Sequence, residues 1–81
     1  MMTRNAAFER LTKVFQEVFD DETIRLTDST VSEDIEDWDS FEHINLIVAI
    51  EKEFSFKVPA EKVLGIENVG EMVDIIMDLG Y

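Results

Sequence analysis

Apolar residues recur at helical spacing in three stretches of the chain. Between about positions 6 and 19 they fall three or four residues apart, which predicts a first amphipathic helix. The same spacing predicts a second helix from Ser40 to Phe54 and a last helix from about 69 that ends at Gly80. Between them, Pro59 and Gly65 delimit one or two helical turns. We therefore expect an all-α fold, a small four-helix bundle of three main helices plus one short helix, with a long loop between helices 1 and 2.

The loop between the first two helices runs from about 20 to 38 and keeps no period for long. An unstructured connection of this length is uncommon in a compact domain, so it either contains a short helical turn or has a functional role. We expect its scattered apolar side chains to hold it against the helices: Ile24, Leu26, Val31 and Ile35.

The start of the second helix is well marked. Asp39 is a good N-cap, and Glu42 three residues later predicts a reciprocal capping box, so Ser40 becomes the first helical residue. Unpaired backbone N–H groups and the helix dipole make such a terminus a favourable seat for a phosphate. Trp38, just before the cap, is interpreted as a packing residue that fixes the approach to the helix. A similar cap is predicted at Asn68 for the last helix.

Placed at about 100° per residue, the second helix carries two apolar stripes. Leu46, Ile50 and Phe54 form the inner stripe, and His43 falls on this side, where a packed or hydrogen-bonded role is the simplest interpretation. A second stripe lies roughly opposite and is either covered by the same domain or exposed as a docking surface beside Ser40. It consists of Phe41, Ile44 and Val48.

Composition narrows the classes of function. The 81 residues suit a single domain over 1–81, and no stretch has the pattern of a signal peptide or membrane span, so the cytoplasm is the default compartment. A net charge of −12 disfavours nucleic acid and anionic membranes as partners and favours basic protein surfaces. A monomer is the simplest expectation for so charged a domain.

No enzyme active site is predicted, because the sequence shows no nucleophile with an adjacent base and no Gly-rich phosphate loop. The acids at 34, 36, 37 and 39 do not fit an EF-hand, so no metal site is expected. With no cysteine, any thiol chemistry must be imported. The chain is therefore interpreted as a carrier or binding module.

Asp39-Ser40-Phe41, followed by an apolar helix that ends Ala49-Ile50-Glu51-Lys52-Glu53-Phe54, resembles the acyl carrier protein family, whose motif is Asp-Ser-Leu or Asp-Ser-Met at the start of its second helix. The resemblance implies that Ser40 carries covalent 4'-phosphopantetheine, with an acyl group held as a thioester, and that Asp39 is recognised by the phosphopantetheinyl transferase. The chain departs from the family at Asp37, often Gly, and at Phe41; Asn45 and Lys52 stand where members often carry acids.

The resemblance also implies partners. Basic surfaces of the transferase, and of acyl-transferring and chain-elongating or modifying enzymes, would dock on one face of the second helix: Phe41, Glu42, Ile44, Val48, Glu51 and Glu53. The implied function is an acyl carrier for fatty acid, polyketide or related lipid synthesis. Two alternatives stay open: a peptidyl or aminoacyl carrier, as in D-alanyl transfer, and an acidic helical interaction domain that is never modified.

Overall fold

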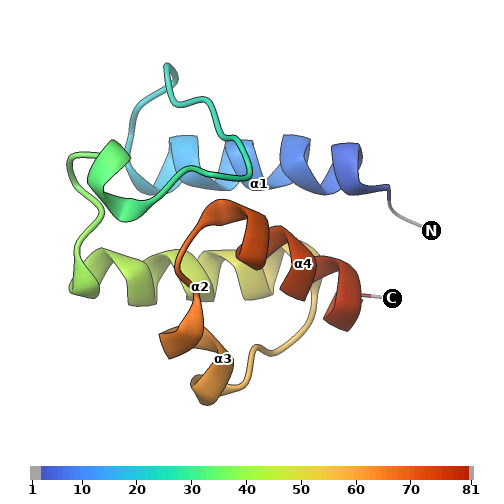
Figure 1. The fold of residues 1–81 in the computed structure, drawn as a ribbon. Helices are drawn as coiled ribbons and strands as arrows, with labels where there is room; N and C mark the ends of the chain where they lie inside the picture. Colours follow the sequence, from blue (N-terminus) through green and yellow to red (C-terminus); the bar gives the residue numbers. More distant parts are fainter. Residues whose placement is uncertain (1–2, 81) are drawn as a thin grey trace.

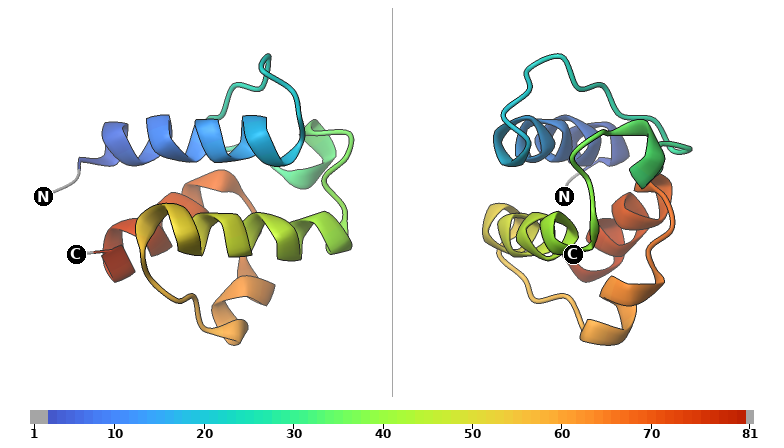
Figure 2. Two further views of the ribbon diagram at one scale, coloured as in Figure 1. Left: turned by 180° about the vertical axis from the view of Figure 1, so that it is seen from behind. Right: turned by 90° about the vertical axis from the view of Figure 1, so that its left-hand side faces the viewer.

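The computed structural model describes residues 3–80, with the side chains at 60, 63, 64 and 80 left outside the description. Its helices are α1 (Arg4–Val18), α2 (Ser40–Phe54), α3 (Ala60–Gly65) and α4 (Val69–Gly80), and a 3₁₀ turn lies at Ser32–Asp34. α1 and α2 run antiparallel, α4 packs against them, and the short α3 lies at the edge (Figures 1 and 2). This all-helical arrangement confirms the predicted fold class.

α1 begins slightly earlier than its apolar pattern, because the Thr3 side chain accepts a hydrogen bond from the Ala6 N–H at 3.1 Å and caps the helix. It ends at Val18, where Phe19 is the C-cap and Asp20 adopts a left-handed backbone conformation. Its apolar face is buried against the inner stripe of α2 and against α4. The fully buried large side chains come from all three: Phe15, Leu11, Leu46, Ile50, Met72, Ile76, Val69 and Val73.

The long loop is attached to the start of α4. The carbonyl of Thr30 accepts from the Val69 N–H and that of Asp28 from the Gly70 N–H, each at 2.9 Å. The first backbone N–H groups of a helix have no acceptor within the helix, so they can donate to the loop. Arg4, at the start of α1, also pairs with Asp28 and with Asp74 of α4, and these two partners raise its pKa, with the Asp74 hydrogen bond the larger cause. The loop is thus tied to both helices.

The loop also confirms one of its two predicted forms, because it contains the 3₁₀ turn. Ile24 is buried, and Leu26 and Ile35 pack against the core, as expected of residues that hold the loop in place. Val31 is half-buried.

α3 spans Ala60–Gly65 and ends at Gly65 as predicted, but not by the capping geometry that is typical of glycine. A glycine stop uses a left-handed backbone, whereas Gly65 is the last residue of the helix, has no positive φ, and is followed by extended Ile66 as the C-cap. Within residues 3–80, no helix combines the length and the apolar character needed to cross a membrane.

Candidate functional site

Ser40 is exposed and is the first residue of α2. The Asp39 carboxylate accepts from the Glu42 N–H at 2.8 Å, which confirms the N-cap. The first intrahelical acceptor is the Asp39 carbonyl, which is bonded to the His43 N–H at 2.9 Å, so the N–H groups of Ser40 and Phe41 have no acceptor within the helix. This end of the helix also carries the positive end of the dipole. A phosphate ester at Ser40 would lie where both favour negative charge.

The capping box predicted with Glu42 is only half formed. The Asp39 N–H donates to the Asp37 carbonyl at 3.1 Å, and the Glu42 carboxylate accepts instead from the Asn45 amide at 3.0 Å. The Glu42 carboxylate therefore bonds to the side chain one turn further along α2, and not to the backbone N–H of the N-cap residue. The cap of α4 forms as predicted, since the Asn68 oxygen accepts from the Glu71 N–H at 2.8 Å.

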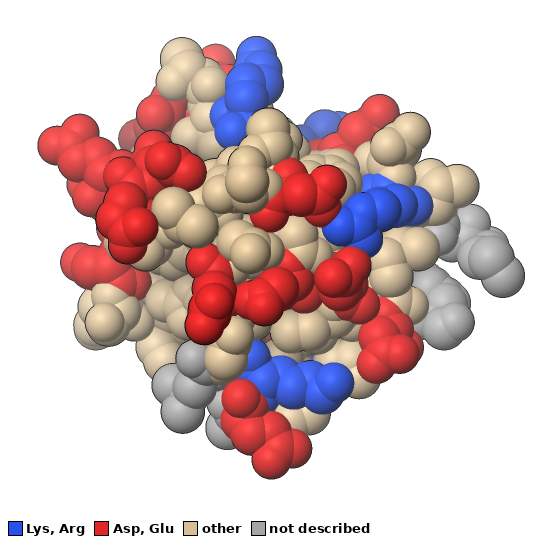
Figure 3. Space-filling view, in the orientation of Figure 1, with Lys and Arg blue, Asp and Glu red and all other residues tan. Residues whose placement is uncertain are grey.

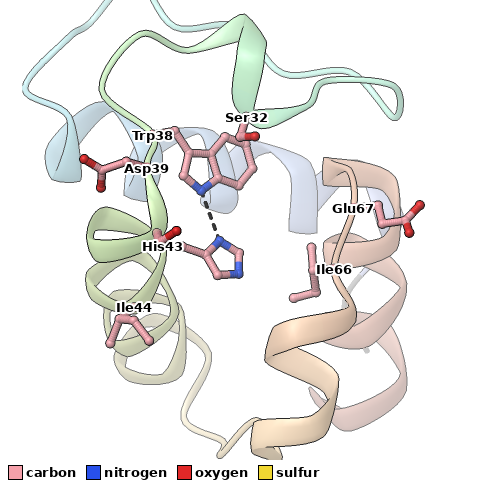
Figure 4. Close-up of a pocket in the computed structure, with 8 residues that line it drawn as sticks. Ser32, Trp38, Asp39, His43, Ile44, Ile66 and Glu67 are labelled. Atoms are coloured by element: carbon pink, nitrogen blue, oxygen red, sulfur yellow. Dashed lines mark hydrogen bonds between the residues drawn. The ribbon is translucent and has the colours of Figure 1, made fainter.

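An open hollow of about 530 Å³ lies beside Ser40. The first turn of α2 forms one wall, the segment between α3 and α4 forms the other, and the 3₁₀ turn lies above (Figure 4). Three of its residues, Ser32, Ile66 and Glu67, are not among the predicted site residues, because they come from segments outside the motif that only the fold brings to it. The lining residues are Ser32, Trp38, Asp39, Ser40, His43, Ile44, Ile66 and Glu67.

Trp38 and His43 form a hydrogen-bonded pair in this hollow. Trp38 is 8% exposed and packs edge-on against Phe15, with ring centroids 5.2 Å apart. Its indole N–H donates to Nδ1 of His43 at 3.0 Å (Figure 4). These contacts bear out both interpretations, Trp38 as a packing residue before the helix and His43 as a hydrogen-bonded one. That the imidazole also lines the hollow could not be read from its helical position.

The second stripe of α2 is exposed. Among the side chains that the structure describes, the large exposed apolar ones are Phe41, Ile44 and Val48, at 76%, 56% and 46% exposure. Of the two alternatives for this stripe, coverage by the same domain is therefore wrong. We call these three residues the α2 stripe. Lys52 follows Val48 by four residues, so it continues the α2 stripe and is also exposed.

The acids expected beside the α2 stripe make contacts within the protein. Glu51 accepts from the Val58 N–H at 2.8 Å, and Glu53 pairs with Arg10 of α1, also at 2.8 Å. Their charges remain near the surface, but both carboxylates hold elements of the bundle together.

No group of three or more His, Cys, Asp or Glu residues in the described part of the chain is arranged to hold a metal ion.

Comparison with known proteins agrees with this geometry. Residues 9–76 match the family model described as the phosphopantetheine attachment site. The structure is similar to the solution NMR structure of the holo acyl carrier protein from Geobacter metallireducens, with 38% sequence identity and a TM-score of 0.83. The match covers 89% of this chain and 83% of that one. The chain therefore belongs to the phosphopantetheine-attachment family: it is a carrier protein of the acyl carrier type, which works with covalently attached phosphopantetheine and is not itself an enzyme.

Proposed function

We propose that Ser40 is the attachment point of the phosphopantetheine and that the protein carries acyl intermediates of fatty acid, polyketide or related lipid synthesis. The observation that carries this proposal is the placement of Ser40, exposed at the capped N-terminus of α2 and at the rim of the hollow. The residues there fit the group, because the helix terminus suits the phosphodiester and the hollow offers space beside it. Phosphopantetheine supplies the thiol that a chain without cysteine lacks.

Asp39 has two roles in this proposal. Its carboxylate caps α2 and so fixes the orientation of Ser40, and its exposed charge is available to the phosphopantetheinyl transferase. The transferase is the partner that the family implies.

The α2 stripe is the proposed docking surface for the transferase and for enzymes that load, extend or modify the acyl group. Contiguous exposed apolar residues are typical of an interaction site. The stripe begins next to Ser40, so a protein bound there holds the attached group close to its own active site, and the encounter becomes effectively intramolecular. Of the acids proposed to take part, Glu51 lies beside the stripe and Glu42 lies on another flank of α2, and their negative charge attracts basic partner surfaces in a salt-dependent way, whereas the Glu53 charge is paired with Arg10 of α1.

Transfer of phosphopantetheine to Ser40 can be tested directly by intact-protein mass spectrometry. Wild type and Ser40→Ala would be incubated with coenzyme A, magnesium and a promiscuous phosphopantetheinyl transferase. We expect wild type to gain one phosphopantetheinyl group and Ser40→Ala to gain none.

Ser32→Ala is the matched control, because Ser32 lines the same hollow but lies in the 3₁₀ turn. It should be modified like wild type. Circular dichroism should show that all three proteins are equally helical. Modification of Ser40→Ala, or of none of the proteins, would contradict the proposal; the latter result would favour an unmodified interaction domain.

A further inference from the structure

A second hollow, of about 320 Å³, adjoins the end of the α2 stripe that is far from Ser40. Val48, the last residue of the stripe, lines it, so the two surfaces are continuous. The half-buried ring of Phe56 and two lysine side chains also line it. We call it the lysine hollow. Its lining residues are Val48, Glu51, Lys52, Ser55, Phe56 and Lys57.

The segment that follows α2 is held firmly against the helix and forms one side of the lysine hollow. A residue with a left-handed backbone reverses the chain directly after α2, and the Phe56 N–H donates to the Glu51 carbonyl at 3.3 Å. The Glu51 carboxylate accepts from the Val58 N–H at 2.8 Å. The ring of Phe56 stacks on that of buried Phe54, with centroids 6.0 Å apart. The lysine hollow therefore has a fixed wall.

The two lysines give this hollow a charge opposite to that of the whole chain. Lys52 and Lys57 are both exposed. Among residues 3–80, the ion pairs are made by Arg4 and Arg10, and neither lysine takes part in one. Glu51 offsets one of the two positive charges, so the hollow stays positive in a protein of net charge −12. A lysine in the last turn suits the helix dipole, but Lys57 lies beyond the helix, where the dipole gives no reason for it.

The charge near α2 therefore differs between its two ends. Asp37 and Asp39, both exposed, come just before Ser40, whereas the lysine hollow lies at the other end. A helix rises about 1.5 Å per residue, so Lys52 lies about 18 Å from Ser40 along the axis. A protein interface of standard size buries about 800 Å² on each partner, a patch about 30 Å across. One partner bound on the α2 stripe can therefore contact both ends.

We propose that the lysine hollow is a docking subsite for an acidic side chain of a partner enzyme, carried next to an apolar side chain. The carboxylate pairs with Lys52 and Lys57, and the apolar group packs against Val48 and Phe56. A basic patch of the same partner faces the acids near Ser40. The subsite thus fixes the direction in which the partner lies along α2, because a reversed complex would bring like charges together. This inference rests on the proposed docking role of the α2 stripe and adds the chemical character and orientation of the partner.

A synthetic helical peptide of about 18 residues, about 27 Å long, serves as the probe. It carries leucines on one face, glutamates at one end and lysines at the other, with a nitroxide spin label at either end. ¹⁵N-labelled protein without the arm is titrated and followed by NMR. A label at the basic end should broaden the amide signals around Ser40, and a label at the acidic end those of residues 52–57. A peptide with glutamine in place of glutamate should bind about two- to fivefold more weakly and lose this preference.

Lys52→Gln/Lys57→Gln removes both positive charges from the lysine hollow and keeps side chains of similar shape. We expect its Kd for the peptide to rise about two- to tenfold, with equal broadening at both ends of α2 for either label. Lys13→Glu, on exposed surface of α1 outside the hollow, lowers the net charge by the same amount and is the matched control. It should keep both the affinity and the direction of binding of wild type.

A peptide that binds the α2 stripe without a preferred direction would overturn the subsite while leaving the stripe as a docking surface. So would wild-type affinity and direction in Lys52→Gln/Lys57→Gln, or an equal loss in Lys13→Glu, which would make the effect one of net charge. Binding that misses the α2 stripe would contradict the docking role itself. Attachment at Ser40 is tested separately, because the peptide experiment needs no arm and Ser40→Ala should bind the peptide like wild type.

Discussion

At the scale of single residues, two glycines occupy opposite surroundings. Gly70, in the first turn of α4, donates its N–H to the Asp28 carbonyl, and a Cβ at this position would lie 2.8 Å from that same oxygen. Gly65 has open space around it and needs no left-handed backbone. Glycine is therefore required at 70 by the close approach of the loop, whereas the structure gives no such reason at 65.

Gly70→Ala should destabilise the protein by about 1–3 kcal/mol, because either the backbone of the loop or that of α4 must move to admit the methyl group. Gly65→Ala should be neutral or stabilising by up to about 1 kcal/mol, since alanine favours the helix. Urea unfolding monitored by circular dichroism measures both. Equal stability of the two variants would mean that the contact between the loop and α4 is not tight in solution.

At the scale of the element, the two faces of α2 have different surroundings. Its inner residues Leu46, Ile47, Ile50 and Phe54 are buried in the bundle, while the α2 stripe faces solvent beside Ser40. A substitution on the stripe can therefore change docking without removing a core contact. Lys52, at the far end of the stripe, gives this face a positive charge.

Ile44→Asp should raise the KM of the phosphopantetheinyl transferase about tenfold or more, as expected when a charge replaces a residue near the centre of an interface. Its thermal midpoint should stay close to that of wild type, because the side chain is 56% exposed. Asn5→Asp, on exposed surface of α1, adds the same negative charge away from the stripe and controls for net charge. An unchanged KM for Ile44→Asp would exclude Ile44 from the transferase docking surface.

Features of α2 that depend on residues close in sequence can be predicted from the sequence, whereas contacts with residues distant in sequence cannot. The cap at Asp39 and the inner stripe follow from spacing within the helix, and the structure confirms both. The contact of Glu53 with Arg10 could not be predicted, because α1 supplies the partner from a distant part of the chain. The hollow beside Ser40 was missed for the same reason, since Ile66 reaches it from beyond α3.

A further reason why contacts escape prediction is that neighbouring side chains compete for the same partner. Glu42 had the right spacing for a capping box, but Asn45 lies one turn ahead and offers an amide donor. A spacing rule identifies the groups that can meet and does not decide between two partners within reach.

At the scale of the whole molecule, repulsion among the many negative charges opposes the folded state. Acidic side chains are spread over the face shown in Figure 3, among few basic ones. The chain carries a net charge of −12 within dimensions of 31 × 25 × 22 Å. At about 0.01 M salt the screening length is about 30 Å, so charges on opposite sides of the protein still repel, whereas at about 0.15 M it falls to about 8 Å. The folded state should therefore depend on salt.

Raising NaCl from about 10 to about 150 mM should increase the thermal midpoint by about 4–8 °C, equivalent to about 1 kcal/mol for a domain of this size. Differential scanning calorimetry at constant pH measures the change. Sodium chloride and potassium chloride should act alike, because the effect is one of screening. A midpoint that does not rise with salt would mean that the ion pairs of Arg4 and Arg10, which salt weakens, dominate over the general repulsion.

The burial of Trp38 between the end of α1 and His43 has a practical consequence. The sequence contains no other tryptophan, so the ultraviolet emission of the native protein comes chiefly from this one indole. One side of the ring contacts the core and its N–H points to the hollow beside Ser40. The protein is thus its own fluorescent sensor, in which a single unlabelled chromophore is sensitive both to loss of the fold and to events at the serine.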